Sequence, residues 1–200
     1  LLEAYSREMK YTADLAEFMH LQGIIFLQSI MGNNASKLPS GFVNQDIQNQ
    51  IFSSINTRFS GDIFYEFSIG DSLPDIDFLR QFDGAIVDAN WDISSYGSDT
   101  SSLEQAAAEI FNLKLSDLAK AFEKPVIIRL AYPSLNGVEK GCIQTDLLCT
   151  EFMDLSQMNT QEQQLIGFNL PLQSQIYQAI LSQINDLEWV GGIVSSGYNL

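Results

Sequence analysis

The sequence is poor in basic residues. Its 200 residues contain 10 Lys+Arg against 25 Asp+Glu, which gives a formal net charge of −15 at pH 7. Because a phosphate backbone repels an acidic surface, this balance argues against nucleic acid as a partner. Long apolar runs are also missing: those at 23–27 and 126–128 are too short to cross a bilayer. We therefore expect no membrane insertion within this segment.

Sequence patterns for metals and nucleotides are scarce as well. The single histidine, His20, is far in sequence from the two cysteines, and a second cysteine pair does not exist. A zinc site needs more ligands than this. No Gly-rich turn or P-loop follows an apolar strand, which argues against a bound nucleotide. We expect no cofactor and no metal.

The two cysteines, Cys142 and Cys149, are close together in a polar stretch. An even count, short spacing and loop context favour a local disulfide, which is typical of exported proteins. The alternative is a pair of unrelated reduced thiols. The disulfide interpretation predicts an extracellular or cell-surface location.

Apolar residues make up 46% of the chain and charged residues 18%, a mixture typical of a folded globular protein. Apolar positions at helical spacing alternate with short apolar runs. The pattern predicts strands near 24–30, 63–69, 85–91, 126–132 and 192–196. It predicts helices over 2–19, from Asp46 as a cap through Ile55, from Ser102 to about Glu123, and from Leu172 to Ile184, with a long loop at 133–171.

This strict alternation predicts an α/β fold with a parallel sheet covered by helices. Two architectures fit, an open doubly wound sheet and part of a (β/α)8 TIM-type barrel. The open sheet would be supported by a Gly-rich phosphate-binding turn after one strand, and none is present.

Four short sequence patterns resemble the second half of (β/α)8 glycoside hydrolases of the mannanase-like retaining clan. Residues 82–91 (Phe-Asp-Gly-Ala-Ile-Val-Asp-Ala-Asn-Trp) resemble the sixth strand, and 124–128 (Lys-Pro-Val-Ile-Ile) resemble the approach to the seventh. Residues 11–16 are similar to the helix before strand four, and 189–194 to the approach to strand eight. The resemblance implies one partial barrel domain over residues 1–200, with about five parallel strands and outer helices, as a fragment of a longer chain.

The catalytic residues of that clan are not where the resemblance places them. Retaining glycosidases use two carboxylates about 5 Å apart, here expected at the ends of strands four and seven. Gln28, Ser29, Ile30 and Met31 occupy the first position, and Arg129 or Leu130 occupies the second. An arginine cannot form a glycosyl ester, and a glutamine cannot act as a carboxylic acid. The resemblance therefore implies that the usual mechanism is lost.

Other carboxylates remain at neighbouring strand ends. Side-chain alternation places Glu66 on one face of its strand, and Asp88, Asn90 and Asp92 on one face of the next. Charged residues in an apolar parallel strand favour the barrel interior, so Glu66 and Asp88 are the candidate catalytic residues, at the end of the barrel where active sites gather. The alternative is an internal ion pair of either carboxylate with Arg129.

Aromatic residues follow several of the expected strands. Their rings can stack on the C–H faces of sugars, although packing within loops explains them equally well for Trp91 and Tyr132, and better for Tyr96. The candidate substrate-binding residues are Asn90, Trp91, Asp92, Arg129, Tyr132 and Tyr198.

Three functions are compatible with these features. The favoured one is a glycoside hydrolase-like domain that interacts with oligo- or polysaccharide and has weak or no catalysis. The second is an active O-glycosyl hydrolase with its carboxylates relocated to Glu66 and Asp88. The third is an α/β scaffold domain without a connection to sugars. The missing glutamate pair favours the first over the second.

Overall fold

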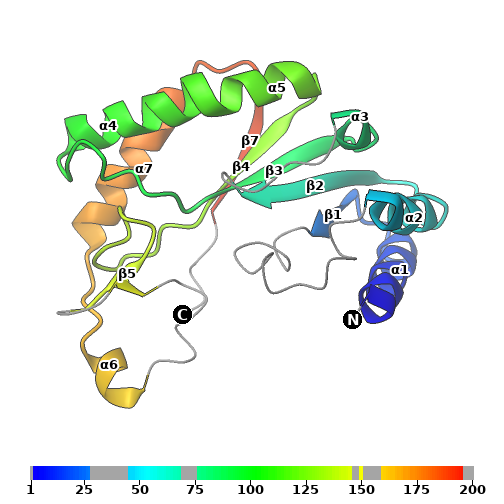
Figure 1. The fold of residues 1–200 in the computed structure, drawn as a ribbon, viewed down its shortest axis with the longest axis horizontal. Helices are drawn as coiled ribbons and strands as arrows, with labels where there is room; N and C mark the ends of the chain where they lie inside the picture. Colours follow the sequence, from blue (N-terminus) through cyan, green and yellow to red (C-terminus); the bar gives the residue numbers. More distant parts are fainter. Residues whose placement is uncertain (1, 28–44, 69–75, 146–148, 151–158, 196–200) are drawn as a thin grey trace. The chain divides into compact units, whose positions relative to one another are not determined.

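A computed structural model describes residues 2–27, 45–68, 76–145, 149–150 and 159–195 of the chain (Figure 1). Two compact units make up the chain: Leu1–Asp88 with Ala121–Ile127, and Ala89–Lys120 with Ile128–Leu200. A parallel sheet of five strands, in the order β1-β2-β3-β4-β7, draws strands from both. The expected α/β class with a parallel sheet of five strands is thereby confirmed.

The first unit alternates helices and strands. It contains α1 (Leu2–Phe18), β1 (Gly23–Leu27), α2 (Gln45–Asn56), β2 (Asp62–Ser68), α3 (Ile76–Leu79) and most of β3 (Gly84–Ala89). β2 pairs in parallel with β1 on one side and with β3 on the other. In this register Glu66 is opposite Leu27 of β1 and Ile86 of β3.

The core of this unit lies on one face of its strands. Ile63, Tyr65 and Phe67, which alternate along β2, are buried there together with Phe26 of β1. The ring of Phe82 contacts those of Tyr65 (5.1 Å between centroids), Phe26 (5.4 Å) and Phe52 of α2 (4.6 Å). The helix face expected for 2–19 is also buried, at Tyr5, Met9, Ala13 and Ala16. The apolar face of the helix and the apolar face of the strands therefore contribute to the same aromatic core.

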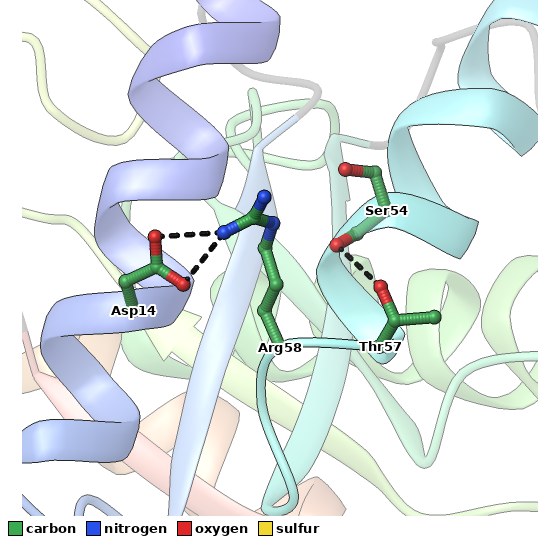
Figure 2. Close-up of polar contacts among 4 residues, drawn as sticks. All are labelled: Asp14, Ser54, Thr57 and Arg58. Atoms are coloured by element: carbon green, nitrogen blue, oxygen red, sulfur yellow. Dashed lines mark hydrogen bonds and ion pairs between the residues drawn. The ribbon is translucent and has the colours of Figure 1, made fainter.

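Polar contacts at the surface join α1 to the end of α2 (Figure 2). Nη1 of Arg58 donates to both carboxylate oxygens of Asp14 at 2.9 Å, and Oγ1 of Thr57 donates to the carbonyl oxygen of Ser54 at 3.1 Å. Both ion-pair partners are about half exposed. Exposed pairs of this kind contribute at most about 1 kcal/mol, so the buried face dominates the packing.

The second unit is built mainly around two helices that pack together, α4 and α7. Leu103, Ala106 and Ala107 of α4 are buried, as are Ile176 and Ile180 of α7. The remaining elements of the chain are α4 (Thr100–Glu109), the π-helical segment η3 (Ile110–Leu115), α5 (Ser116–Phe122), β4 (Val126–Leu130), β5 (Ile143–Gln144), β6 (Cys149–Thr150), α6 (Thr160–Gln164), α7 (Leu170–Ile184) and β7 (Val190–Ser195). The end of α5 and the start of β4, within Ala121–Ile127, belong to the first unit.

All five strands form where the pattern predicts them, but three helix starts differ, those of α2, α4 and α7. The N-cap of α4 is Asp99, not Ser102, because the Asp99 carboxylate accepts from both the backbone N–H and the hydroxyl of Ser102. Asp46 lies inside the first turn of α2, where a carboxylate still favours the positive end of the helix dipole.

The expected loop at 133–171 is also more ordered than predicted. It contains the antiparallel β5–β6 pair and α6, and α7 already begins at Leu170 because Asn169 caps it and accepts from the N–H of Leu172. Pro171 lies in the first turn of α7, where its missing N–H costs nothing. The single-domain expectation for residues 1–200 stays a prediction.

Candidate functional site

The carboxylates of Glu66 and Asp88 belong to the first unit and lie on the same face of adjacent strands. Asp88 is opposite Ser68, one alternate position beyond the Glu66–Ile86 pair. Strand spacing and rise put the two Cα atoms roughly 8 Å apart. Glu66 is fully buried (0% exposed) and Asp88 is buried as well. The two acids therefore form a pair of neighbours on the sheet face opposite the aromatic core.

The same face is filled by Phe64 on the N-terminal side of these acids. A Cβ added to Gly23 would lie 3.1 Å from the Phe64 ring, and one added to Gly84 would lie 2.6 Å from it. The two glycines of the flanking strands thus provide the space for this ring. The Phe64 ring therefore occupies this face near the start of the strands, and Glu66 and Asp88 follow it toward their C-terminal ends.

Tyr5 of α1 is electrostatically coupled to Glu66. Burial raises the pKa of the Tyr5 phenol well above its ordinary value, and the negative charges of Glu66 and Glu8 raise it further. The phenol is therefore neutral at physiological pH. It can donate or accept a hydrogen bond there, but it cannot serve as a phenolate base.

The candidate binding residues that follow β3 belong to the second unit. The Trp91 side chain is only 8% exposed, and its ring contacts Phe111 (5.6 Å between centroids), which in turn stacks on Trp189 (6.5 Å). The indole Nε1 has no hydrogen-bond partner among the residues that the structure describes. A buried donor without a partner costs free energy, which makes this indole nitrogen unusual.

Tyr132 fixes the backbone at that position. Its hydroxyl accepts from the Trp91 backbone N–H at 3.0 Å and donates to the Trp91 carbonyl oxygen at 3.2 Å. Burial raises the pKa of Tyr132, although the hydrogen bond from Trp91 opposes part of that change. The Tyr132 side chain is completely buried, so in this structure it supports Trp91 and presents no ring face to solvent.

The turn after β4 packs on the segment that follows β3. The backbone N–H of Ile93 donates to the carbonyl oxygen of Glu139 at 2.7 Å, and Asp92 forms an antiparallel bridge with Lys140. Gly141 has φ +72°, and a Cβ there would lie 2.9 Å from the carbonyl oxygen of Asn90. Only glycine fits this close approach without strain.

The expected disulfide is present and closes a short loop directly after that turn. Cys142 and Cys149 are bonded, with 5.5 Å between their Cα atoms. The disulfide joins the residue before β5, the strand that contains Gln144, to the first residue of β6. Loop spacing therefore predicted the covalent structure correctly.

Two further predicted residues have defined surroundings. The Asp92 carboxylate accepts from the backbone N–H and the hydroxyl of Ser94, at 2.8 and 2.7 Å, which fixes it in a turn. Tyr96 is about half exposed, and its hydroxyl donates to Glu109 at 2.9 Å. The Tyr96 ring therefore remains on the surface of the unit.

The structure gathers Asn90, Trp91, Asp92 and Tyr132 in one unit and the Glu66–Asp88 pair in the other. Arg129 lies in β4 and belongs to the unit with Trp91, so its expected ion pair with a carboxylate stays a prediction. Tyr198 and the strand-end positions 28–31 lie outside the described residues.

The described ranges contain no group of three or more His, Cys, Asp or Glu side chains arranged to hold a metal ion. Within the same ranges, none of the helices combines the length and apolar character that crossing a membrane requires.

Glu139 was missed by the sequence interpretation. It is buried although it lies in a turn between Gly137 and Gly141, both with positive φ. The available signal was the two glycines four residues apart directly before Cys142, which indicate a tight turn that a disulfide holds.

No protein-family model matches the sequence, and no protein of curated function matches it. The structure does match solved structures. A GH113 β-1,4-mannanase in a complex superposes with a TM-score of 0.64 and 15% identity over 98% of this chain and 52% of its own. The fold is that of about half a (β/α)8 barrel, and it is similar to the barrels of these glycoside hydrolases.

Two further structures give the same result. The GH113 β-mannanase of Alicyclobacillus acidocaldarius matches at TM-score 0.64 and 15% identity, over 98% of this chain and 51% of its own. A β-glucuronidase of Ruminococcus gnavus matches at TM-score 0.56 and 11% identity, over 99% of this chain and 29% of its own. The chain spans about half the length of the mannanases. Identities this low show the fold alone.

Proposed function

We propose that this glycoside hydrolase-like domain binds oligo- or polysaccharide outside the cell and hydrolyses it weakly or not at all. The observation that carries the binding proposal is Trp91. Its indole Nε1 is a buried donor without a partner among the described residues, at the carboxyl end of β3, where barrel enzymes hold their ligands. A sugar hydroxyl oxygen is a suitable acceptor for it. Asn90, Asp92 and Arg129, and Tyr198 beyond β7, are proposed to complete the contacts.

The proposal of weak or absent hydrolysis follows from the strand that carries the nucleophile in the resembling clan. β4 (Val126–Leu130) ends in Arg129 and the buried Leu130, so it supplies no carboxylate. A retaining mechanism needs one carboxylate as nucleophile and one as acid/base. The disulfide between Cys142 and Cys149 supports the extracellular location, because such bonds persist in oxidising compartments.

A second candidate is an active glycosidase that uses Glu66 and Asp88. It is supported by their position on one face of adjacent strands. Against it, β4 supplies no carboxylate where the resembling clan has its nucleophile, so both catalytic roles would have to lie on β2 and β3.

The test is an assay of the protein, expressed with any flanking residues that its gene encodes, on β-linked manno- and gluco-oligosaccharides. We expect binding without robust turnover. Trp91→Phe, which deletes the indole N–H and keeps an aromatic ring, should weaken binding, whereas Tyr96→Phe on the surface of the same unit should not. Circular dichroism confirms that each variant is folded.

Robust turnover that is abolished by Glu66→Gln or Asp88→Asn would establish the second candidate instead. Neither turnover nor binding on the whole panel would remove the connection to sugars and leave the scaffold interpretation.

A further inference from the structure

A polar pocket lies in the second unit, between the turn that contains Glu139 and the residues that precede α7. Its volume is about 350 Å³, and the residues that line it include Asn136, Glu139, Gln144, Thr145, Leu165 and Asn169. This volume is in the lower part of the range of small-molecule sites. Gln144 and Leu165 are exposed, so the rim is accessible, whereas Glu139 and Thr145 are buried.

The buried acid of this pocket is unsatisfied. Glu139 is 6% exposed, and its Oε2 has no hydrogen-bond partner among the residues that the structure describes. A carboxylate removed from water without partners is costly, and proteins retain such groups where a ligand or bound solvent satisfies them. One carboxylate oxygen of a residue that lines the pocket therefore remains available to accept a hydrogen bond.

The walls around Glu139 are fixed before any ligand arrives. Asn169, the cap of α7, donates through Nδ2 to Oδ1 of Asn136 at 3.0 Å. The Asn136 backbone accepts from the N–H of Gln144 at 2.7 Å and donates to the carbonyl oxygen of Gly167 at 2.9 Å. The Cys142–Cys149 bond holds the strand that carries Gln144. A prearranged site of this kind loses little entropy when a ligand binds.

The polar groups also define the ligand's chemistry. The Glu139 carboxylate accepts hydrogen bonds, and the side-chain amides of Asn136 and Gln144 carry N–H donors. The Oε1 of Gln144 already accepts from Nζ of Lys140 at 3.0 Å, so the Gln144 NH2 group is the part left for a ligand. A hydroxyl group both donates and accepts, and it matches this mixture. An ammonium group only donates.

We infer that this pocket is a ligand site for a neutral polyhydroxylated molecule, in which Glu139 accepts a hydroxyl hydrogen bond and the amides of Asn136 and Gln144 donate to neighbouring hydroxyl oxygens. The choice of a saccharide as the probe rests on the proposed function. The requirement for a hydroxyl donor rests on the pocket alone.

The test titrates the full protein with methyl β-mannoside while the side-chain amide signals of Asn136, Gln144 and Asn169 are followed by NMR. We expect shifts of these signals, with a Kd on the order of 1 mM. Because a hydrogen bond to a charged group is lost, Glu139→Gln should raise the Kd by about 10-fold or more. Glu188→Gln, an exposed acid of the same unit, should leave it unchanged.

Three outcomes would overturn the inference: no shift of these amide signals, an unchanged Kd in a folded Glu139→Gln protein, or tighter binding of propylammonium than of the glycoside. If Glu139→Gln does not fold, the amide shifts of the unaltered protein decide. The role proposed for Trp91 fails separately: oligosaccharide binding that is unchanged in Trp91→Phe would contradict it, while binding of the glycoside that is weakened in Glu139→Gln would still support the pocket.

Discussion

The hydroxyl of Tyr132 satisfies both backbone polar groups of Trp91, accepting from its N–H at 3.0 Å and donating to its carbonyl oxygen at 3.2 Å. Trp91 lies two residues beyond the end of β3. At this point one side chain, from the segment after β4, makes the backbone hydrogen bonds that a neighbouring strand makes within a sheet. These two bonds fix the Trp91 backbone.

Tyr132→Phe keeps the ring and removes both hydrogen bonds. We expect a loss of about 2 kcal/mol in the free energy of unfolding, because the buried Trp91 N–H is left without a partner. Urea unfolding followed by tryptophan fluorescence measures this change. Tyr96→Phe removes one exposed hydroxyl and should have the smaller effect. Equal stability of the two variants would contradict the role assigned to Tyr132.

Gly84→Ala tests the space that Phe64 occupies. The new Cβ would lie 2.6 Å from the Phe64 ring and 3.0 Å from the carbonyl oxygen of Pro125, so one of them has to move. We expect destabilisation by about 1–3 kcal/mol, the usual cost of overpacking. Gly192→Ala in β7 is the matched control, since nothing lies within 4 Å of its added Cβ. Thermal unfolding of both variants provides the comparison.

Breaking the Cys142–Cys149 bond should weaken both stability and the pocket. For a loop this short the chain-entropy estimate is roughly 2–3 kcal/mol. Urea unfolding with and without a reducing agent measures the loss, and Cys142→Ser/Cys149→Ser should reproduce it. Thiol titration of the unreduced, denatured protein should find no free thiol from this pair. Two titratable thiols would refute the bond.

Acid should destabilise the protein through Glu17 and Asp99. Hydrogen bonds from the backbone and hydroxyl of Ser60 lower the pKa of Glu17, and those from the hydroxyl and backbone of Ser102 lower the pKa of Asp99. A lowered folded-state pKa gives stability that is present above the unfolded-state pKa and is lost as the pH falls through the folded-state value. We expect the loss below about pH 4.

Glu17→Gln should flatten that acid limb, since its contribution no longer titrates. Glu188→Gln removes an exposed charge elsewhere and controls for the change in net charge. Unfolding free energies measured from neutral to acidic pH test this. An acid limb of the same steepness in Glu17→Gln and in the unaltered protein would contradict the role of the Ser60 contacts.

The sequence predicted the strands well because they are short apolar runs bounded by polar turns, and burial depends on that pattern. It did not decide between Asp99 and Ser102 as the cap, since both are good capping residues and only the folded backbone shows which one accepts. The buried positions of Glu139 and Tyr132 follow from contacts between turns distant in sequence. Periodicity within one element carries no information on such contacts.

The two parallel pairings of the first unit also differ in the length of chain that each must close. β1 and β2 join residues about forty positions apart, whereas β2 and β3 join residues about twenty apart. Halving a loop lowers its closure entropy by about 0.6 kcal/mol. The β2–β3 pair, with Phe64 seated over Gly84, is therefore expected to form early in folding, and β1 to dock onto an existing edge.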